Sequence, residues 1–264
     1  MERHASGGQI DLFTKAIVKT PCMDMTRGLT EANLGTPDYR LALEQHQSYV
    51  QALESCGVVV TTLPGDEAYP DSTFVEDTAL LTSHCAIITR PGAPSRRGET
   101  TAIQQTISQF YSSVEQIQAP GSIDAGDIMM VGDHYYIGLS ERTNPEGANQ
   151  MIQILKRYAM SGSTVALKDV LHLKTGVAYL ENNNLAVCGE FIEHPAFESY
   201  NRIIIPEDEA YAANCIWVNG IVIMPAGHPE SKQTIEAAGY PVIEVNTSEF
   251  QKLDGGVSCL SLRF

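Results

Sequence analysis

The chain has 264 residues, of which 43% are hydrophobic and 19% are charged, a composition typical of a globular protein with a large core. Its 32 acidic residues outnumber its 17 basic ones, and the formal net charge of −15 disfavours binding to nucleic-acid phosphates or anionic lipid. No run of 18 apolar residues is present, so no membrane span and no membrane partner are expected.

The six cysteines form neither a C-x-x-C pair nor a regular framework. This pattern argues against zinc ribbons and disulfide scaffolds and is typical of a reducing compartment. The first ten residues, MERHASGGQI, are polar and lack the apolar stretch of a signal peptide. We therefore expect a cytoplasmic protein with a flexible leader over residues 1–12 and a single domain over residues 13–264.

The first expected elements are a strand near the N-terminus, at residues 16–20, and a helix at residues 37–56 that stops at Gly57. Further along, four segments share one layout of small or polar residues, an apolar run, a polar turn and a second apolar run. The turn residues Asn219-Gly220 and Gly132-Asp133 accept positive φ, which favours tight hairpins. Each segment is predicted to be a β-hairpin, and they cover residues 74–91, 125–140, 175–190 and 213–227.

Amphipathic helices are predicted after several of these hairpins, at residues 98–110, 145–160 and 229–238. In the second of them, Asn144 is the expected N-cap and Pro145 the first helical residue. A short β-rich run follows each connection, at residues 58–63, 114–118, 163–167, 202–205 and 241–245. The repeating unit is thus hairpin, helix, strand, with a period of about 40 to 50 residues that is typical of propellers and arrays.

Four full units and one split unit fit the chain length, and together they predict an α/β fold of five units around a central channel. The split unit joins residues 16–20 to a C-terminal strand at residues 257–264. If the units ring a common axis, the starts of the hairpins converge on it. Although a polar residue there can simply cap a strand, the position is polar in every unit, at Asp71, Glu76, Asp77, Asp124, Asp127, His172, Asn214 and Cys259.

One thiol stands out because Gly255 and Gly256 deliver Cys259 to the start of the last apolar strand. Glycine permits close approach of a ligand, and a thiol beside such an opening is a candidate nucleophile with His172 as its proton donor and acceptor. Carboxylates at Asp77 and Asp124 would clamp the nitrogens of a cationic electrophile such as a guanidinium. The alternative, that Cys259 packs as a small hydrophobic residue, stays open at this point.

Two loop arginines complement these acids. Arg96 and Arg142 each precede a predicted helix, and they would hold the carboxylate of a zwitterion whose cation lies deeper. No metal-ligand spacing such as H-E-x-x-H is present, and no glycine-rich phosphate loop follows a strand. We therefore expect neither a required metal nor a cofactor.

Several long motifs resemble one family. The segments PDSTFVED, ITRPGAPSRRGE, AGDIMMVGDHYYIGLSERTN, LHLKTG, AANCI and DGGVSC are similar to dimethylarginine dimethylaminohydrolase, especially its bacterial form, in an order that runs from about residue 16 to the C-terminus. The resemblance implies the pentein fold, a five-fold pseudosymmetric α/β propeller. It implies hydrolysis of Nω-methylated arginines, asymmetric dimethylarginine and monomethylarginine, to citrulline and dimethylamine or methylamine.

The resemblance also implies residue roles. Cys259 would be the nucleophile that forms a covalent thiouronium intermediate, His172 the general acid and base, and Asp124 the third catalytic residue. The small-molecule substrate would be contacted by Leu29, Asp71, Glu76, Asp77, Arg96, Arg142 and Leu253. Leu29 lies in a glycine-bearing segment that looks like a lid. The sequence does not fix the assembly, for which a homodimer is one option.

Two other functions remain open. Arginine deiminases resemble this chain in fold but carry an Asp two residues after the histidine, where this chain has Lys174. Loss of a carboxylate on that flank would make room for methyl groups, which favours methylated over free arginine. A non-catalytic binder of cationic amino acids is the third option. The resting state of Cys259, thiol or thiolate, is also left open.

Overall fold

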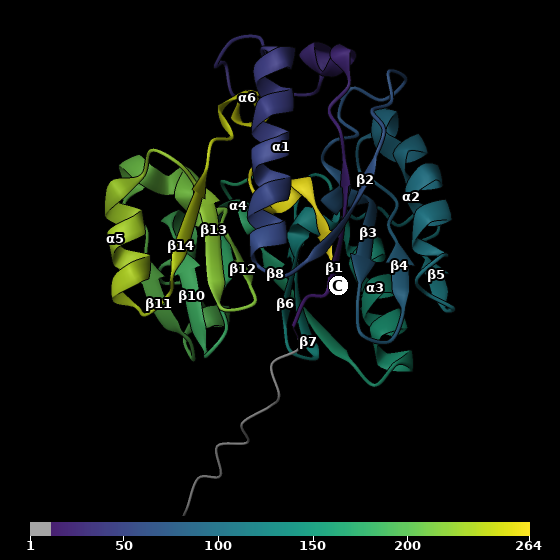
Figure 1. Ribbon diagram of the computed structural model, residues 1–264. Coiled ribbons are helices and arrows are strands. Elements are labelled where there is room, and N and C mark those ends of the chain that lie inside the picture. The colour runs from purple at the N-terminus through teal and green to yellow at the C-terminus, as the bar shows by residue number, and fades with distance from the viewer. Residues whose placement is uncertain (1–11) are drawn as a thin grey trace, which may run out of the picture.

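The computed structural model describes residues 12–264, so the leader predicted over residues 1–12 lies outside the described residues except for Leu12. Within this range the strands form five three-stranded sheets (Figure 1). In every sheet the middle strand pairs antiparallel with one neighbour and parallel with the other. The sheets have the orders β15-β1-β2, β3-β4-β5, β6-β7-β8, β9-β10-β11 and β12-β13-β14.

The bounds of these elements match the predicted units closely. The strands are β1 (Lys15–Lys19), β2 (Val59–Leu63), β3 (Ala79–Leu81), β4 (Ala86–Ile88), β5 (Val114–Gln116), β6 (Ile128–Val131), β7 (His134–Leu139), β8 (Ser161–Ala166), β9 (Val177–Tyr179), β10 (Asn184–Val187), β11 (Asn201–Ile204), β12 (Ile216–Val218), β13 (Ile221–Pro225), β14 (Val242–Val245) and β15 (Leu262–Arg263). The α-helices are α1 (Tyr39–Ser55), α2 (Thr100–Ile107), α3 (Pro145–Arg157), α4 (Leu173–Gly176), α5 (Pro229–Ala237) and α6 (Ser248–Gln251).

The local signals explain where the long helices begin and end. The side chain of Asp38 accepts hydrogen bonds from two backbone N–H groups of the first turn of α1, and Gly57 ends that helix with a φ of 84°. Asn144 caps α3 by accepting from the N–H of Gly147, as predicted. The β12–β13 hairpin turns on Asn219, whose φ is 52°, and a glycine.

The split unit is confirmed. β1 pairs antiparallel with β15 and parallel with β2, so the two ends of the described chain complete one sheet, and the C mark in Figure 1 lies among the strands. The predicted strand at residues 257–264 is wrong in its first half. Ser258–Leu260 form a 3₁₀ turn and only Leu262–Arg263 are extended, so Cys259 lies in a turn rather than in a strand.

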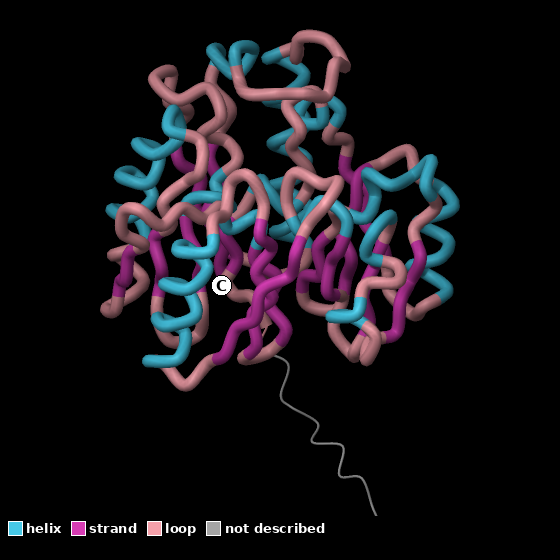
Figure 2. The backbone as a smooth tube through the Cα atoms, turned by 180° about the vertical axis from the view of Figure 1, so that it is seen from behind, coloured by secondary structure: helices cyan, strands magenta, loops and turns pink. Residues whose placement is uncertain are grey.

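One unit departs from the hairpin–helix–strand pattern. Between β10 and β11 the chain makes two 3₁₀ turns, Gly189–Phe191 and Pro195–Phe197, instead of an α-helix. Pro195 lies in the middle of this short connection, and a proline removes the N–H and restricts the residue before it, so a continuous helix cannot cross it. Figure 2 shows the remaining long helices on the outside of the ring of strands.

Hydrophobic packing joins each unit of the ring to the next. The described residues contain five hydrophobic clusters, and each one is shared by two neighbouring units. Ile17 of the split unit, for example, packs with Ile88 of the next, and Val218 of the last unit packs back on Val18 of the split one. Burial of apolar surface between every adjacent pair of units stabilises the closed five-unit propeller. No helix in the described part of the chain is long and apolar enough to cross a membrane.

Candidate active site

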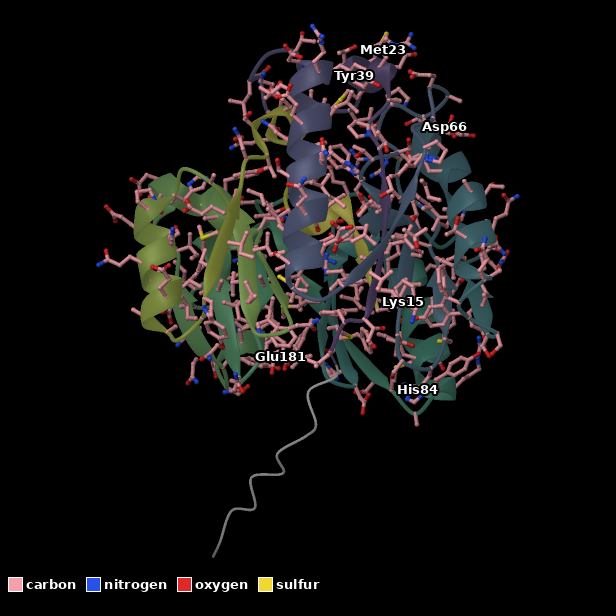
Figure 3. The ribbon with its side chains drawn as sticks, viewed as in Figure 1. Lys15, Met23, Tyr39, Asp66, His84 and Glu181 are labelled. Atoms are coloured by element: carbon pink, nitrogen blue, oxygen red, sulfur yellow. The ribbon has the colours of Figure 1, made fainter. Side chains whose placement is uncertain are left out.

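The described residues enclose two separate cavities that share no lining residue. The first, about 120 Å³, is lined by nine of the ten predicted site residues: Leu29, Asp71, Asp77, Arg96, Asp124, Arg142, His172, Leu253 and Cys259. We call it the Cys259 cavity. The second, about 130 Å³, is lined by Glu76, Lys174, Ser258 and Arg263 together with many apolar side chains, and we call it the Lys174 cavity. Glu181, near the bottom of Figure 3, belongs to the second cavity, whereas the loop before Tyr39, near the top, borders the first.

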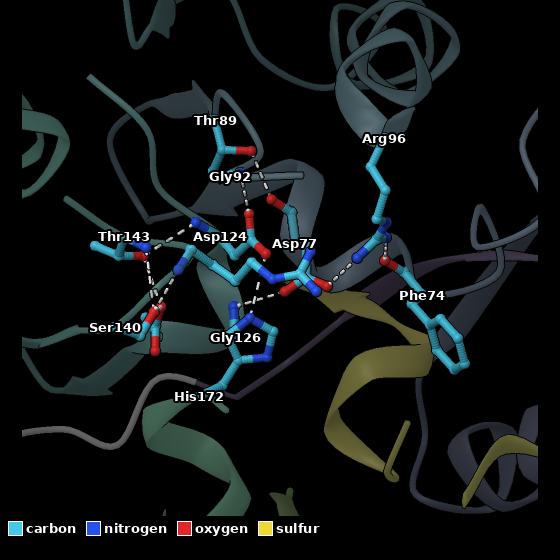
Figure 4. A network of polar contacts seen from close by, with 12 residues as sticks. Phe74, Asp77, Thr89, Gly92, Arg96, Asp124, Gly126, Ser140, Thr143 and His172 are labelled. Carbon is cyan, nitrogen blue, oxygen red and sulfur yellow. Dashed lines mark hydrogen bonds and ion pairs between the residues drawn. The ribbon is translucent and has the colours of Figure 1, made fainter. Parts of the chain in front are cut away.

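The imidazole of His172 is held beside two carboxylates. His172 immediately precedes α4, and its Nε2 lies 3.2 Å from Oδ2 of Asp124 (Figure 4). A side chain on Gly126 would lie 2.8 Å from Asp77 Oδ1 and 3.0 Å from His172 Nδ1, so only glycine lets these groups approach so closely. The N–H of Gly126 donates to the Asp77 carboxylate at 3.0 Å.

Asp127 fixes the loop that carries this histidine. Its Oδ1 accepts from the N–H of Leu173 at 2.9 Å, and its Oδ2 accepts from the hydroxyls of Ser140 and Thr143, both at 2.6 Å. Asp127 is fully buried and does not line the Cys259 cavity. The sequence placed Asp127 among the converging residues but gave it no role, because its partner lies 46 residues away.

These carboxylates set the charge of His172. Burial alone would lower its pKa, but Asp77, Asp124 and Asp127 together outweigh burial and raise the pKa of His172 to about 9. At neutral pH the imidazole is therefore protonated and ready to donate a proton. The carboxylate of Asp77 is itself kept ionised, since despite its burial the Arg96 and His172 charges hold its pKa below the usual range.

The thiol of Cys259 faces the same cavity from the 3₁₀ turn. Its Sγ accepts from the N–H of Gly256 at 3.4 Å, and the residue is 9% exposed. Burial, and then the charges of Glu76 and Asp77, raise the pKa of Cys259 to about 12. These pKa values favour a neutral thiol beside an imidazolium over a resting thiolate.

Arg96 is buried and already engaged. Its guanidinium donates to Asp77 at 2.5 Å, to both oxygens of Glu99, and to the backbone carbonyls of Asp71 and Phe74. These contacts use four of its five N–H groups. Glu99 was missed at the sequence level because a buried acid three residues after an arginine looks like an ordinary helical pair. Glu99 holds the Arg96 guanidinium in place, and Arg96 in turn orients the carboxylate of Asp77.

Arg142 is the freer cation at this cavity. Within residues 12–264 its guanidinium has no hydrogen-bond or ion-pair partner, and burial raises the pKa of the nearby Asp71 although the charges of Arg96 and Arg142 oppose that rise. Oδ1 of Asp71 accepts from the N–H of Leu29 at 2.9 Å and so ties down the glycine-bearing segment at the rim. The side chain of Leu29 is 42% exposed, as expected for a residue at an entrance.

Glu76 and Lys174 point to the other cavity. The Lys174 ammonium lies 2.6 Å from the Glu76 carboxylate, which also accepts from Ser258 Oγ at 2.8 Å and has Arg263 at 3.7 Å. The Glu76 carboxylate therefore faces away from the Cys259 cavity. Lys174 does not line that cavity either, and its part in favouring methylated over free arginine stays a prediction.

One group of side chains has spacing suited to a metal ion. Ligand atoms of Asp77, Asp124 and His172 all lie within 4.8 Å of one another. However, Arg96 already pairs with Asp77, and the imidazole contacts Asp124. A metal ion would have to displace these partners and a proton from His172, so the donor set fits an incoming organic cation better than a metal.

Known proteins share both the sequence and the architecture. A family model described as "N,N dimethylarginine dimethylhydrolase, eukaryotic" matches residues 36–261. The N(G),N(G)-dimethylarginine dimethylaminohydrolase of Pseudomonas aeruginosa is 61% identical over 254 residues, which cover 96% of this chain and 100% of that protein. The enzyme of the same name from Streptomyces coelicolor is 33% identical and covers 94% of this chain and 96% of its own length.

Solved structures give the same result. The Pseudomonas aeruginosa enzyme, as a mutant in complex with citrulline, superposes with a TM-score of 0.95 at 60% identity and covers 96% of this chain and 100% of its own. The N-terminal domain of ArgZ, an arginine dihydrolase, has a TM-score of 0.83 at 22% identity, covers 96% of this chain and 97% of its own, and supports the fold alone. This chain belongs to the dimethylarginine dimethylaminohydrolase family, and its fold is the predicted five-unit α/β propeller.

Proposed function

We propose that this protein hydrolyses Nω-methylated arginines to citrulline and dimethylamine or methylamine. The observation that carries the proposal is one cavity that holds a thiol, an imidazolium and the carboxylates of Asp77 and Asp124. The relative from Pseudomonas aeruginosa, 61% identical to this chain, has been solved with citrulline, and a dimethylarginine dimethylaminohydrolase structure that is 60% identical to this chain holds an adduct with S-methyl-L-thiocitrulline. Citrulline is the product that this reaction leaves on the amino acid.

The charges of the cavity match a zwitterion. The substrate guanidinium would lie between Asp77 and Asp124, which hold its nitrogens and direct its carbon to the sulfur of Cys259. The substrate carboxylate would pair with Arg142, whose guanidinium has no partner among the described residues. Arg96 would act through Asp77, and Leu29, Asp71 and Leu253 line the remaining cavity wall.

The first half of the reaction forms the covalent intermediate. The Cys259 sulfur attacks the guanidinium carbon and forms a C–S bond, while the thiol proton passes to solvent. His172 then gives its proton to the methylated nitrogen, the C–N bond breaks, and the amine leaves. The product of these steps is an S-alkylthiouronium on Cys259.

The second half consumes one water. Neutral His172 takes a proton from water as the oxygen attacks the thiouronium carbon. The C–S bond then breaks, the hydroxyl proton of the intermediate passes to the leaving sulfur and restores the Cys259 thiol, and the carbonyl of citrulline forms. The sum is one methylated arginine plus one water giving one citrulline plus one amine.

The pKa of the thiol implies that substrate helps to ionise it. Cys259 has a pKa of about 12, so little thiolate is present at neutral pH. A guanidinium bound next to the sulfur places a positive charge at short range and in a poorly solvated site, which stabilises the thiolate. Nucleophile and electrophile thus become reactive together.

We further propose that the protein works in the cytoplasm as a single catalytic domain over residues 13–264. All six cysteines are free thiols in the structure, which suits a reducing compartment. The ring closure between β1 and β15 supports one domain, because the last strand completes the first sheet.

The test compares two substrates. We expect kcat/KM for asymmetric dimethylarginine to exceed that for free arginine by at least about tenfold, and a preference for arginine would favour the deiminase alternative. Cys259→Ser should abolish turnover, while Cys85→Ser, at a buried thiol outside both cavities, should keep it within about threefold. Turnover that survives Cys259→Ser would reject covalent catalysis, and binding without any turnover in the unmodified protein would favour the binder alternative.

A further inference from the structure

The thiol of Cys259 and the imidazole of His172 sit on separate loops, and no hydrogen bond joins them within residues 12–264. Their spacing therefore depends on what holds the two loops together. The side-chain amide of Asn214 does this directly. Its Oδ1 accepts from the N–H of Ser258 at 2.8 Å, and its Nδ2 donates to the carbonyl of Lys174 at 3.1 Å.

Both bonds are made to backbone groups next to the reacting residues. Ser258 immediately precedes Cys259, and Lys174 comes two residues after His172. The orientation of the amide is fixed by chemistry, because an N–H needs an acceptor and a carbonyl needs a donor. Asn214 is only 7% exposed, so water does not compete freely for these bonds.

The glycine before the nucleophile turn also follows from this contact. A side chain on Gly256 would lie 2.4 Å from the Asn214 Cγ, which no real contact permits. The same Gly256 donates its N–H to the Cys259 sulfur. The backbone of Gly256 therefore lies next to both the amide of Asn214 and the thiol.

Asn214 does not line the Cys259 cavity. We propose that Asn214 is a positioning residue, which sets the distance between the nucleophile and the proton donor without contacting substrate. The inference rests on the proposed function. It assigns to the β12 unit, which contributes no group to the Cys259 cavity, the task of holding the His172 and Cys259 loops in register.

The test variant is Asn214→Asp. It keeps an oxygen that accepts from the N–H of Ser258 but replaces the donor to Lys174 with an oxygen that repels that carbonyl. A displacement of about 1 Å between reacting groups costs about 10²-fold in rate. We expect kcat to fall about 30- to 100-fold, with KM changed by less than about threefold because the substrate contacts remain.

Asn219→Asp is a matched control at the opposite end of the β12–β13 hairpin. The Asn219 amide also joins distant segments, since Oδ1 accepts from the N–H of Phe13 at 2.9 Å and Nδ2 donates to the carbonyls of Phe13 and Cys56 at 2.8 and 3.0 Å. The substitution removes the same donor, but its bonds are made to Phe13 and Cys56 rather than to the loops of His172 and Cys259. We expect a lower Tm with kcat kept within about twofold.

The proposal is overturned if folded Asn214→Asp keeps kcat within threefold, or if KM rises as much as kcat falls. It is also overturned if Asn219→Asp loses as much kcat. Should Asn214→Asp fail to fold, hydrogen exchange at the Ser258 amide of the unmodified protein decides, because exchange as fast as in an exposed loop would exclude the bond. Turnover by the unmodified protein and its loss in Cys259→Ser test the proposed function separately from these outcomes.

Discussion

The two cavities of the channel are similar in size but differ in how their acids are satisfied. In the Lys174 cavity, the carboxylate of Glu76 is surrounded by Lys174, Arg263 and a serine hydroxyl. Among the described residues around the Cys259 cavity, only two buried cations, Arg96 and His172, serve four acids, which are Asp77, Glu99, Asp124 and Asp127. The first set of charges is complete and the second is short of a cation. The Cys259 cavity is therefore the one suited to bind and react with a guanidinium, because its acids lack a positive charge.

Neighbouring residues in the chain face opposite cavities. Glu76 and Asp77 are adjacent, as are Ser258 and Cys259, and in each pair the first member lines the Lys174 cavity and the second the Cys259 cavity. The hairpin starts thus form a thin partition, with structural charges on one side and reactive groups on the other. Substitutions at the two members of such a pair can therefore be compared directly, because the two residues share backbone surroundings but line different cavities.

The largest difference is expected between His172 and Lys174. His172→Ala removes the proton donor and should lower kcat about 10³-fold. Lys174→Gln should keep kcat within about fivefold but reduce the free energy of unfolding by about 1–3 kcal/mol, since Glu76 loses its shortest charged partner. Steady-state kinetics and urea unfolding measure both. An equal loss of kcat in the two variants would show that the partition does not separate chemistry from structure.

The adjacent acids should differ nearly as much. Asp77→Asn should lower kcat/KM about 10²- to 10³-fold, because the neutral amide no longer pairs with the substrate guanidinium to bind and orient it, and it releases Arg96. Glu76→Gln should cost less than about tenfold, since its carboxylate faces the other cavity. Initial rates with asymmetric dimethylarginine provide the comparison. A greater loss from Glu76→Gln would contradict the orientation of these two side chains.

The pH dependence of thiol reactivity tests the neutral resting state. With a pKa of about 12, the thiolate fraction of Cys259 rises tenfold for each pH unit in the neutral range. We expect its alkylation by iodoacetamide, without substrate, to rise about tenfold per unit from pH 6 to 8.5. The rate specific to this thiol is obtained by subtracting that of Cys259→Ser. A plateau within this range would indicate a resting thiolate paired with His172.

The smallest effect is expected at Ser258. Ser258→Ala removes the hydroxyl that donates to Glu76 but keeps the backbone N–H next to Cys259. We expect the free energy of unfolding to fall by about 1–2 kcal/mol, with kcat within about threefold. Chemical denaturation and initial rates measure the two quantities. A loss of kcat above tenfold would mean that the hydroxyl, and not only the backbone of the turn, orients the nucleophile.

The sequence predicted the repeat well because its signals are local. Hairpin turns such as the one at Asn219 and caps such as Asn144 depend on a few adjacent residues. Of the ten site residues that the resemblance implied, nine line one cavity of the structure. The cavity that each side chain faces was harder to predict. Glu76 and Asp77 are adjacent in the chain, and the 3₁₀ turn over Val75–Thr78 decides which of the two cavities each carboxylate lines.

The roles of the residues that hold the site in place could not be predicted from the sequence either. Asp127 acts on a loop 46 residues away, and Asn214 joins loops 40 and 44 residues away. No local pattern marks a side chain whose partners are distant backbone groups. The strand predicted at the end of the described chain was partly wrong for a related reason. An apolar run after two glycines resembles a strand, and the hydrogen bond from Ser258 to the distant Glu76, which accompanies the 3₁₀ turn, cannot be predicted from it.

The proposed reaction requires a bond between the Cys259 sulfur and the guanidinium carbon of the substrate. Rapid acid quenching during turnover of asymmetric dimethylarginine, followed by mass spectrometry of the peptide that contains Cys259, observes that bond directly. We predict an adduct with the mass of the substrate less dimethylamine, present only while substrate remains and absent in Cys259→Ser. Sustained turnover with an unmodified Cys259 peptide at every quench time, or the adduct on another residue, would contradict the account.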